Sequence, residues 1–411
     1  MTAASGCSGA AVAGAAVPPS GGAGGRPAQG PIGSSHDPQV RTRRWWGGPA
    51  RSHDRGMTST IRLRGPADII TVLPYHLGYR PSDSLVVVCL EGSRLTMVGR
   101  LDLPPPGADP WVAVEELLPR VLEEEPDRVV LVGFETDRDR ADGLSAAMRD
   151  ALLDEGIQVA DRLVVRGKQW WSLDCTGGCC PADGQPVPGD EEVPAVADYV
   201  LLGRRPAASR AELHTRLAPR EEPATAGRCA ELAEDLDAAL GGGGADLTTA
   251  RRAALDTWGE LLDVSADIPP IALGDEAWAR LTVSLRDVTL RDLVIAWACP
   301  GTLGLEVFDP CLIDLADRHL PPHGDDAAQP PGELVRGHDR LTERLAELCR
   351  RSPVELSPGP LTVLASFTWW LGDGALTRVA LDRALAVDPG YRLARLLERM
   401  VDLAIRPRRA A

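Results

Sequence analysis

Lysine is nearly missing from this chain of 411 residues, which holds Lys168 and 43 arginines. Its 59 acidic residues outnumber the 44 basic ones, so the formal net charge is −15. Such an acidic protein is a poor sequence-independent binder of nucleic-acid phosphates or anionic lipids. The arginine bias, together with abundant alanine, glycine and proline, is typical of a GC-rich coding sequence. We therefore expect neither a nucleic acid nor a membrane among the partners.

Long apolar runs and export signals are also lacking. The chain has no run of about 18 apolar residues, which a membrane-spanning helix would need. No basic stretch precedes the short, weakly apolar run at residues 10–17, and this disfavours a secretory signal. We predict a cytoplasmic protein, whose nine cysteines are reduced rather than paired in a disulfide framework.

The sequence signatures of common enzymes are lacking as well. There is no GxGxxG after a strand, no GxxxxGKS or GxxxxGKT phosphate loop, no GxSxG elbow and no HExxH. These absences disfavour a familiar nucleotide enzyme, hydrolase or zinc protease. We predict no cofactor, with zinc as a minor alternative, and we favour a protein that is not an enzyme.

The composition nevertheless predicts an ordinary globular core, because 44% of the residues are apolar and 25% are charged. The length corresponds to roughly two to three domains. Residues 1–56 are rich in small residues, proline and arginine, without apolar periodicity, and we predict a disordered tail there. Met57 directly precedes the first patterned segment, so we also consider the hypothesis that translation starts at Met57.

Residues 57–205 alternate between helix and strand patterns. A helix is expected from Pro66 to Gly78, and Leu85–Leu90 is apolar on both faces, as in a central strand covered on each side. In the returning strand, Leu95, Met97, Leu101 and Leu103 are expected to share one face. Further strands are expected at residues 129–134, 157–165 and 169–175, with helices before the first two of these.

These elements predict an α/β domain with a mixed sheet. Right-handed crossovers make the second, third and fourth strands parallel, and hairpins add the first and fifth strands antiparallel. Strand patterns end near residue 205, so residues 206–411 are expected to form an all-α domain.

One helical stretch, near residues 361–405, matches a tetratricopeptide repeat. Gly372-Asp373, Ala384-Leu385 and Asp388-Pro389 stand at the offsets of the second half of that repeat. About three such units are needed for a free-standing groove, and one is found. We favour a hairpin docked on the protein's own helical domain, while partner binding stays open.

Three separated segments carry a family resemblance: PADIITVLPYHLGYRPSDSLVVV, WWSLDCTGGCCPADGQP and WWLGDGALTRVALDRALAVDPGYRLA. In this order they resemble the actinobacterial domain-of-unknown-function 4192 family, over residues 60–405. The resemblance also places the usual start of the family near Met57. It implies no particular activity. His76 stands where the family usually has an apolar residue, which weakens a catalytic interpretation of that side chain.

Three cysteines gather after the last expected strand, in the segment Cys175-Thr-Gly-Gly-Cys179-Cys180-Pro181. Thiolates bind soft metals such as zinc, but a closed site needs a fourth ligand and the sequence offers no obvious one. A reversible disulfide between Cys175 and one of the other two is a second interpretation. A structural turn with inert thiols is the third, and we favour it.

A second candidate site gathers polar residues at strand ends, where ligands often bind in α/β sheets. These residues precede the first strand or share one face of its partner: Tyr75, Arg80, Asp83, Ser84, Arg100 and Asp102. They also have a purely structural interpretation, in which Asp83 and Ser84 bond to the backbone and Arg100 pairs with Asp102.

The leading functional hypothesis is a non-catalytic cytoplasmic interaction or regulatory protein that binds a protein partner through its helical C-terminal domain. The alternative is a thiol-based redox or metal-binding protein, or an enzyme, that uses the three thiols or the Asp83/Arg100 cleft. A small-ligand-binding module at the strand ends is a third and weaker hypothesis.

Overall fold

The computed structural model describes residues 63–92, 94–175, 180–201, 203–220, 222–242, 244–264, 273–322, 331–403, 405 and 407. The predicted tail at residues 1–56, the hypothetical start at Met57, and Cys179 lie outside the described residues. Within these ranges, no helix combines the length and the apolar character that crossing a bilayer requires.

Residues 63–201, which we call the α/β part, alternate helices and strands as predicted. Helix α1 begins at a proline and ends before Gly78, which takes the left-handed conformation (φ 80°) that a glycine tolerates best. The elements are α1 (Pro66–Leu77), β1 (Ser84–Glu91), β2 (Arg94–Asp102), α2 (Trp111–Glu123), β3 (Arg128–Phe134), α3 (Asp142–Asp154), β4 (Gln158–Arg166), β5 (Gln169–Ser172), β6 (Gln185–Pro186) and α4 (Pro194–Leu201).

The strands form one mixed sheet in the order β2-β1-β3-β4-β5-β6. Strand β1 is antiparallel to both β2 and β3, whereas β3 and β4 are parallel, so β2, β3 and β4 point the same way, as predicted. Strand β5 returns antiparallel to β4, also as predicted. The first strand of the chain therefore lies inside the sheet, between β2 and β3.

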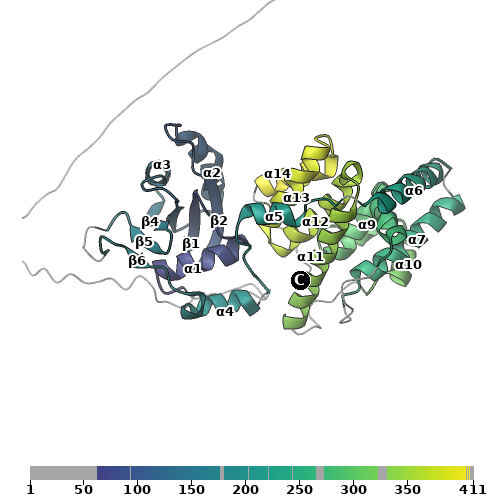
Figure 1. Ribbon diagram of the computed structural model, residues 1–411, viewed down its shortest axis with the longest axis horizontal. Coiled ribbons are helices and arrows are strands. Elements are labelled where there is room, and N and C mark those ends of the chain that lie inside the picture. The colour runs from purple at the N-terminus through teal and green to yellow at the C-terminus, as the bar shows by residue number, and fades with distance from the viewer. Residues whose placement is uncertain are drawn as a thin grey trace, which may run out of the picture. The chain divides into compact units, whose positions relative to one another are not determined.

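Helices cover both faces of this sheet (Figure 1). Leu85, Val87 and Cys89 of β1 pack into the core beneath α2 and α3. The alternate residues of β1 pack against α1 on the opposite face, where Val86 contributes. All six residues from Leu85 to Leu90 are at most 1% exposed, which confirms the prediction of a strand buried on both faces.

One expectation about β2 is wrong. Leu95 packs with the α1 face of the sheet, whereas Met97, Leu101 and Leu103 pack with the α2 and α3 face. The cause is a β-bulge: the register shifts between Cys89 and Leu90, so that Leu90 pairs with Leu95 while Cys89 pairs with Met97. One extra residue in β2 reverses the alternation at that point.

Residues 203–403, which we call the helical part, contain no strand in the ranges that the structure describes, and this confirms the predicted fold class. The helices are α5 (Arg210–Arg216), α6 (Pro223–Gly242), α7 (Gly244–Leu262), α8 (Asp275–Ser284), α9 (Val288–Ala298), α10 (Pro310–His319), α11 (Pro331–Arg351), α12 (Pro358–Leu371), α13 (Gly374–Val387) and α14 (Arg392–Asp402). The apolar faces of α5 and α7 to α14 share one large core, in which Trp258 and Phe367 are almost fully buried. Helix α6 packs on α8 in a smaller cluster that includes Cys229 and Val283.

Helices α12 and α13 form a hairpin. Gly372 closes α12 with φ 78°, and the Asp373 carboxylate caps α13 by accepting from the Leu376 N–H (3.0 Å). The hydroxyls of Thr368 and Thr377 meet across the hairpin at 2.9 Å. The Gly372-Asp373 pair thus forms the turn between the two helices.

Candidate functional site

Two of the predicted strand-end residues, Tyr75 and Arg80, meet at Asp190, in a short 3₁₀ helix before α4. The Tyr75 hydroxyl donates to the Asp190 carboxylate at 2.7 Å, and the Arg80 guanidinium lies 3.5 Å from the same oxygen. Burial and the hydrogen bond to Asp190 raise the pKa of Tyr75 to about 12. The phenol is therefore a hydrogen-bond donor at neutral pH and ties α1 to the segment before α4.

Asp83 connects the start of β1 to the ends of its neighbours. Its carboxylate accepts from the backbone N–H of Thr136 (3.0 Å) and from the Thr136 hydroxyl (3.2 Å). Its carbonyl oxygen accepts from the Leu103 N–H (2.9 Å). Asp83 adopts a positive φ of 40°, which aspartate tolerates better than most residues. The bonds to Thr136 agree with the structural interpretation of Asp83.

The neighbouring Ser84 differs from that interpretation. Its side chain is fully buried, and its hydroxyl oxygen has no hydrogen-bond partner among the described residues. The expected bond from Ser84 to the backbone is therefore wrong. The reason is its position inside β1, where the nearby backbone groups are already engaged in pairing with Asp102 and Phe134.

Arg100 and Asp102 pair as the structural interpretation expected, with a guanidinium-to-carboxylate distance of 2.6 Å. The Arg100 guanidinium also lies 5.9 Å from the centre of the Tyr79 ring, a cation–π contact. Among the described residues, no hydrogen bond or ion pair joins Arg100 to Asp83. Five of the six strand-end side chains thus take part in three separate local interactions, and the Ser84 side chain in none.

The sequence analysis did not predict the ion pair between Glu135 and Arg166, which lies at the same edge of the sheet. Glu135 follows β3 directly, and its carboxylate lies 2.6 Å from the guanidinium of Arg166 at the end of β4. Glu135 also accepts from the backbone N–H groups of Asp139 and Ala141. These bonds use the carboxylate to hold the loop that leads into α3. The available signal was a glutamate placed directly after the apolar run of residues 129–134.

The predicted thiol cluster is described only in part. Cys175 and Cys180 are half-buried, and Cys179 lies outside the described residues. In the described ranges, no three His, Cys, Asp or Glu side chains are grouped as a metal site would require. The redox and zinc interpretations of Cys175, Cys179 and Cys180 therefore stay predictions.

Four other cysteines, Cys89, Cys229, Cys299 and Cys349, are small buried core residues, whereas Cys311 is exposed. Burial raises the pKa of the Cys89 thiol to about 12 and that of Cys229 to about 11. Both are almost fully protonated at neutral pH and are poor nucleophiles and metal ligands.

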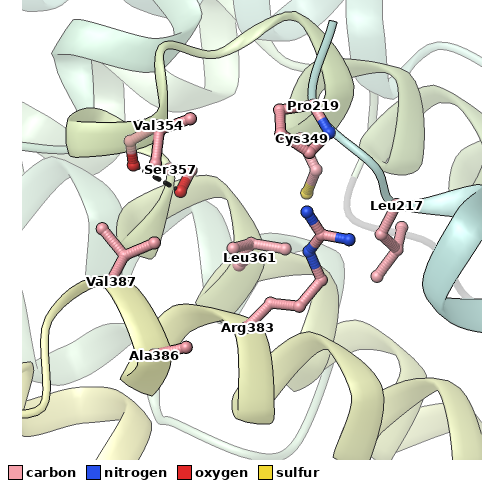
Figure 2. A pocket seen from close by; sticks show the side chains of 9 residues that line it. All are labelled: Leu217, Pro219, Cys349, Val354, Ser357, Leu361, Arg383, Ala386 and Val387. Atoms are coloured by element: carbon pink, nitrogen blue, oxygen red, sulfur yellow. Dashed lines mark hydrogen bonds between the residues drawn. The ribbon is translucent and has the colours of Figure 1, made fainter.

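The helical part contains a cavity of about 160 Å³ beside the α12–α13 hairpin. Its lining comes from the segment after α5, from α11, from the segment before α12, and from α12 and α13. The residues are Leu217, Pro219, Cys349, Val354, Ser357, Leu361, Arg383, Ala386 and Val387 (Figure 2). Sequence analysis did not single out any of these residues, because they converge only through tertiary packing.

The last helix has two contrasting faces. Ala394 and Leu397 are buried in the core of the helical part. The opposite face, which we call the α14 outer face, exposes Arg392, Arg395, Leu396 and Arg399, followed by Leu403. These positions follow the spacing of one helical face. None of the three arginines has a carboxylate partner among the described residues.

Comparison with known proteins gives one positive finding. The family model described as "Domain of unknown function (DUF4192)" matches residues 66–306 and 333–408, and the chain therefore belongs to that family. The match spans the sheet, the cavity and the α14 outer face. Neither a curated protein nor a solved structure gives a significant match.

Proposed function

We propose that this protein is a non-catalytic interaction or regulatory protein and that it binds a protein partner through the helical part. The α14 outer face carries this proposal. It combines three exposed, unpaired arginines with Leu396, whose side chain is 52% exposed. Arginine is enriched at protein interfaces and among the residues that contribute most of the binding energy, and the exposed leucine adds apolar surface beside it.

Charge complementarity indicates the kind of partner. The chain as a whole carries −15, yet the α14 outer face is positive. Nucleic acid and anionic membranes would meet the repulsion of the remaining surface. An acidic amphipathic helix would place carboxylates against Arg392, Arg395 and Arg399, and an apolar side chain against Leu396.

We also propose that the α12–α13 hairpin is tetratricopeptide-like and that α14 continues it. The Gly372-Asp373 turn, the buried small residues Ala380 and Ala384, and the packing of α14 through Ala394 support this interpretation. In a stack of such helices, the outer face of the last helix is the surface to which a further helix adds. An actinobacterial source and a cytoplasmic location are also part of the proposal, and the arginine-rich composition supports the first of these.

The test compares three forms of the full chain as affinity baits in an extract of the source cells. The first is unchanged. The second carries Arg392→Glu, Arg395→Glu and Arg399→Glu on the α14 outer face. The third is a matched control with the same charge change at exposed arginines elsewhere, Arg138→Glu, Arg252→Glu and Arg336→Glu. Circular dichroism verifies that all three are folded.

We expect a reproducible partner that the unchanged and control baits retain and that the α14 variant loses by more than tenfold. Two results would overturn the proposal. One is the absence of any reproducible partner. The other is an equal loss with the α14 and control variants, because that would assign the effect to net charge rather than to this face.

A further inference from the structure

The cavity beside the α12–α13 hairpin has an apolar wall and one charged group. Leu217, Pro219, Leu361 and Val387 contribute hydrocarbon surface, and Arg383 brings a guanidinium into the same space (Figure 2). One N–H of that guanidinium donates to the carbonyl oxygen of His214 at 3.0 Å. The remaining N–H groups are available to a ligand in the cavity.

No carboxylate neutralises Arg383 among the described residues. A half-buried cation beside hydrocarbon is costly unless an anion accompanies it. Most other half-buried arginines among the described residues do have such a partner, as Arg166 has Glu135 at 2.6 Å and Arg251 has Asp287 at 2.7 Å. The unpaired Arg383 thus indicates that an external anion completes the site.

The size and the rim of the cavity indicate which apolar group accompanies the anion in the ligand. A cavity of about 150 Å³ accommodates benzene, so about 160 Å³ accommodates an apolar group of about six heavy atoms. Val354 and Val387, which are 46% and 37% exposed, continue the apolar lining to the surface. The cavity is therefore open to solvent along an apolar path, through which the apolar group of a ligand can enter.

The polar groups of the lining favour binding over covalent chemistry. The Ser357 hydroxyl donates to the Val354 carbonyl oxygen at 2.7 Å and is thereby occupied. The Cys349 sulfur points toward the Arg383 guanidinium (Figure 2), but burial raises the pKa of this thiol well above its usual range. The thiol is protonated at neutral pH and does not act as a nucleophile.

We propose that this cavity binds a carboxylate attached to a short branched apolar group, with Arg383 as the carboxylate-binding residue. A guanidinium donates two parallel N–H bonds to a carboxylate, and the apolar wall holds the attached hydrocarbon. Two sources share this chemistry: a free short-chain fatty acid, and the C-terminal leucine-like residue of a polypeptide. This site is separate from the α14 outer face and does not depend on it.

Calorimetric titration of the full chain tests the proposal with defined probes. Isocaproate represents the free acid, and an acetylated Ala-Ala-Leu peptide with a free C-terminus represents the polypeptide source. Isocaproamide and the amidated peptide are the uncharged counterparts. We expect a Kd of about 1 mM or tighter for at least one acid and at least tenfold weaker binding of its amide.

Three variants localise the binding. Arg383→Gln keeps a donor for His214 and removes the charge, so it should weaken binding of the acid by tenfold or more. Ala386→Phe fills the cavity from an exposed position and should abolish binding without disturbing the core. Arg395→Gln makes the same charge change on α14 and should leave the Kd unchanged.

The two probes distinguish the sources, because the preferred acid shows whether a free molecule or a chain terminus fits. The proposal is overturned if acid and amide bind equally, if Arg383→Gln binds like the unchanged protein, or if neither acid binds at about 10 mM. If the affinity-bait experiment on the α14 outer face fails, this prediction still stands. If the titration fails, the proposal for the α14 outer face still stands.

Discussion

A single histidine in α1 makes the stability of the protein depend on pH. His76 packs beside Tyr199 of α4, with 3.2 Å between Nδ1 and the Tyr199 hydroxyl. Burial, together with the nearby Arg204, lowers the pKa of His76 to about 4. The unfolded value is about 6.5, so between these two pH values the unfolded chain binds a proton that the folded chain does not. The contribution of His76 to stability is therefore intact above pH 6.5 and declines as the pH falls toward 4.

We predict that His76 accounts for a loss of about 2 to 3 kcal/mol in the free energy of unfolding between pH 7 and pH 4.5. The His76→Leu variant lacks the titrating group. Its free energy of unfolding should therefore fall by about 2 to 3 kcal/mol less than that of the unchanged protein over the same pH interval. Urea unfolding of both forms at the two pH values measures the difference. Equal losses in the two proteins would show that other groups carry the acid sensitivity.

A second side chain, Asp287, combines two functions in one buried carboxylate. It caps α9 by accepting from the N–H groups of Thr289 and Leu290, and it pairs with Arg251 of α7 at 2.7 Å. Its side chain is 3% exposed. Asp287→Ala removes both interactions and leaves the arginine unpaired, so we predict a loss of about 3 kcal/mol or more.

The exposed cap Asp309 of α10 is the matched control for Asp287. Asp309→Ala removes a cap without an ion pair and should cost only about 1 kcal/mol. Thermal or urea denaturation compares the two variants. If both lose the same stability, the ion pair with Arg251 contributes nothing.

Sequence reasoning identified polar residues at the strand ends but could not supply most of their partners. Arg100 and Asp102 were assigned to each other correctly, because residues two apart share one face of a strand. Asp190 and Thr136 were missed, since Asp190 lies 115 residues from Tyr75 and Thr136 lies 53 residues from Asp83. Arg383 gave no local signal at all, because its unpaired state appears only after the helices pack.

Among the helices and strands, the elements with strong local patterns were predicted well. Strand β1 was assigned from its continuous apolar run, and α1 from Pro66 and Gly78. Strand β6 and helix α4 were missed because β6 spans only two residues and α4 eight, too short for a clear period. The bulge in β2 was missed because an extra residue is defined only against the partner strand.

The packing of α3 on β3 depends on a glycine. A Cβ added at Gly133 would collide with the Cβ of Ala141, just before α3. We predict that Gly133→Ala costs about 1 to 3 kcal/mol, because the helix must shift from the sheet. Gly143→Ala in α3 meets open space and should be neutral or slightly stabilising. Urea denaturation compares the two, and similar effects would contradict this explanation.

For the chain as a whole, the contrast between a net charge of −15 and a positive α14 outer face has a measurable consequence. If that face attracts an acidic partner, salt should weaken the association. We predict that raising NaCl from about 50 mM to about 500 mM increases the Kd by tenfold or more, mainly through a slower on-rate. The form with glutamates at positions 392, 395 and 399 should show a much smaller salt dependence, and surface plasmon resonance measures both.

Because β1 lies between β2 and β3, one of its edges stays unpaired during synthesis until β3 has emerged. When the ribosome has delivered β1 and β2, the hairpin still has an unpaired edge on β1, and the face of that apolar strand opposite α1 still awaits α2 and α3. The edge is closed only when β3 emerges, some forty residues after β1 ends. During this interval the nascent chain presents an uncharged, β-branched segment that readily recruits other chains. Protection by a chaperone is therefore most valuable between the emergence of β1 and that of β3.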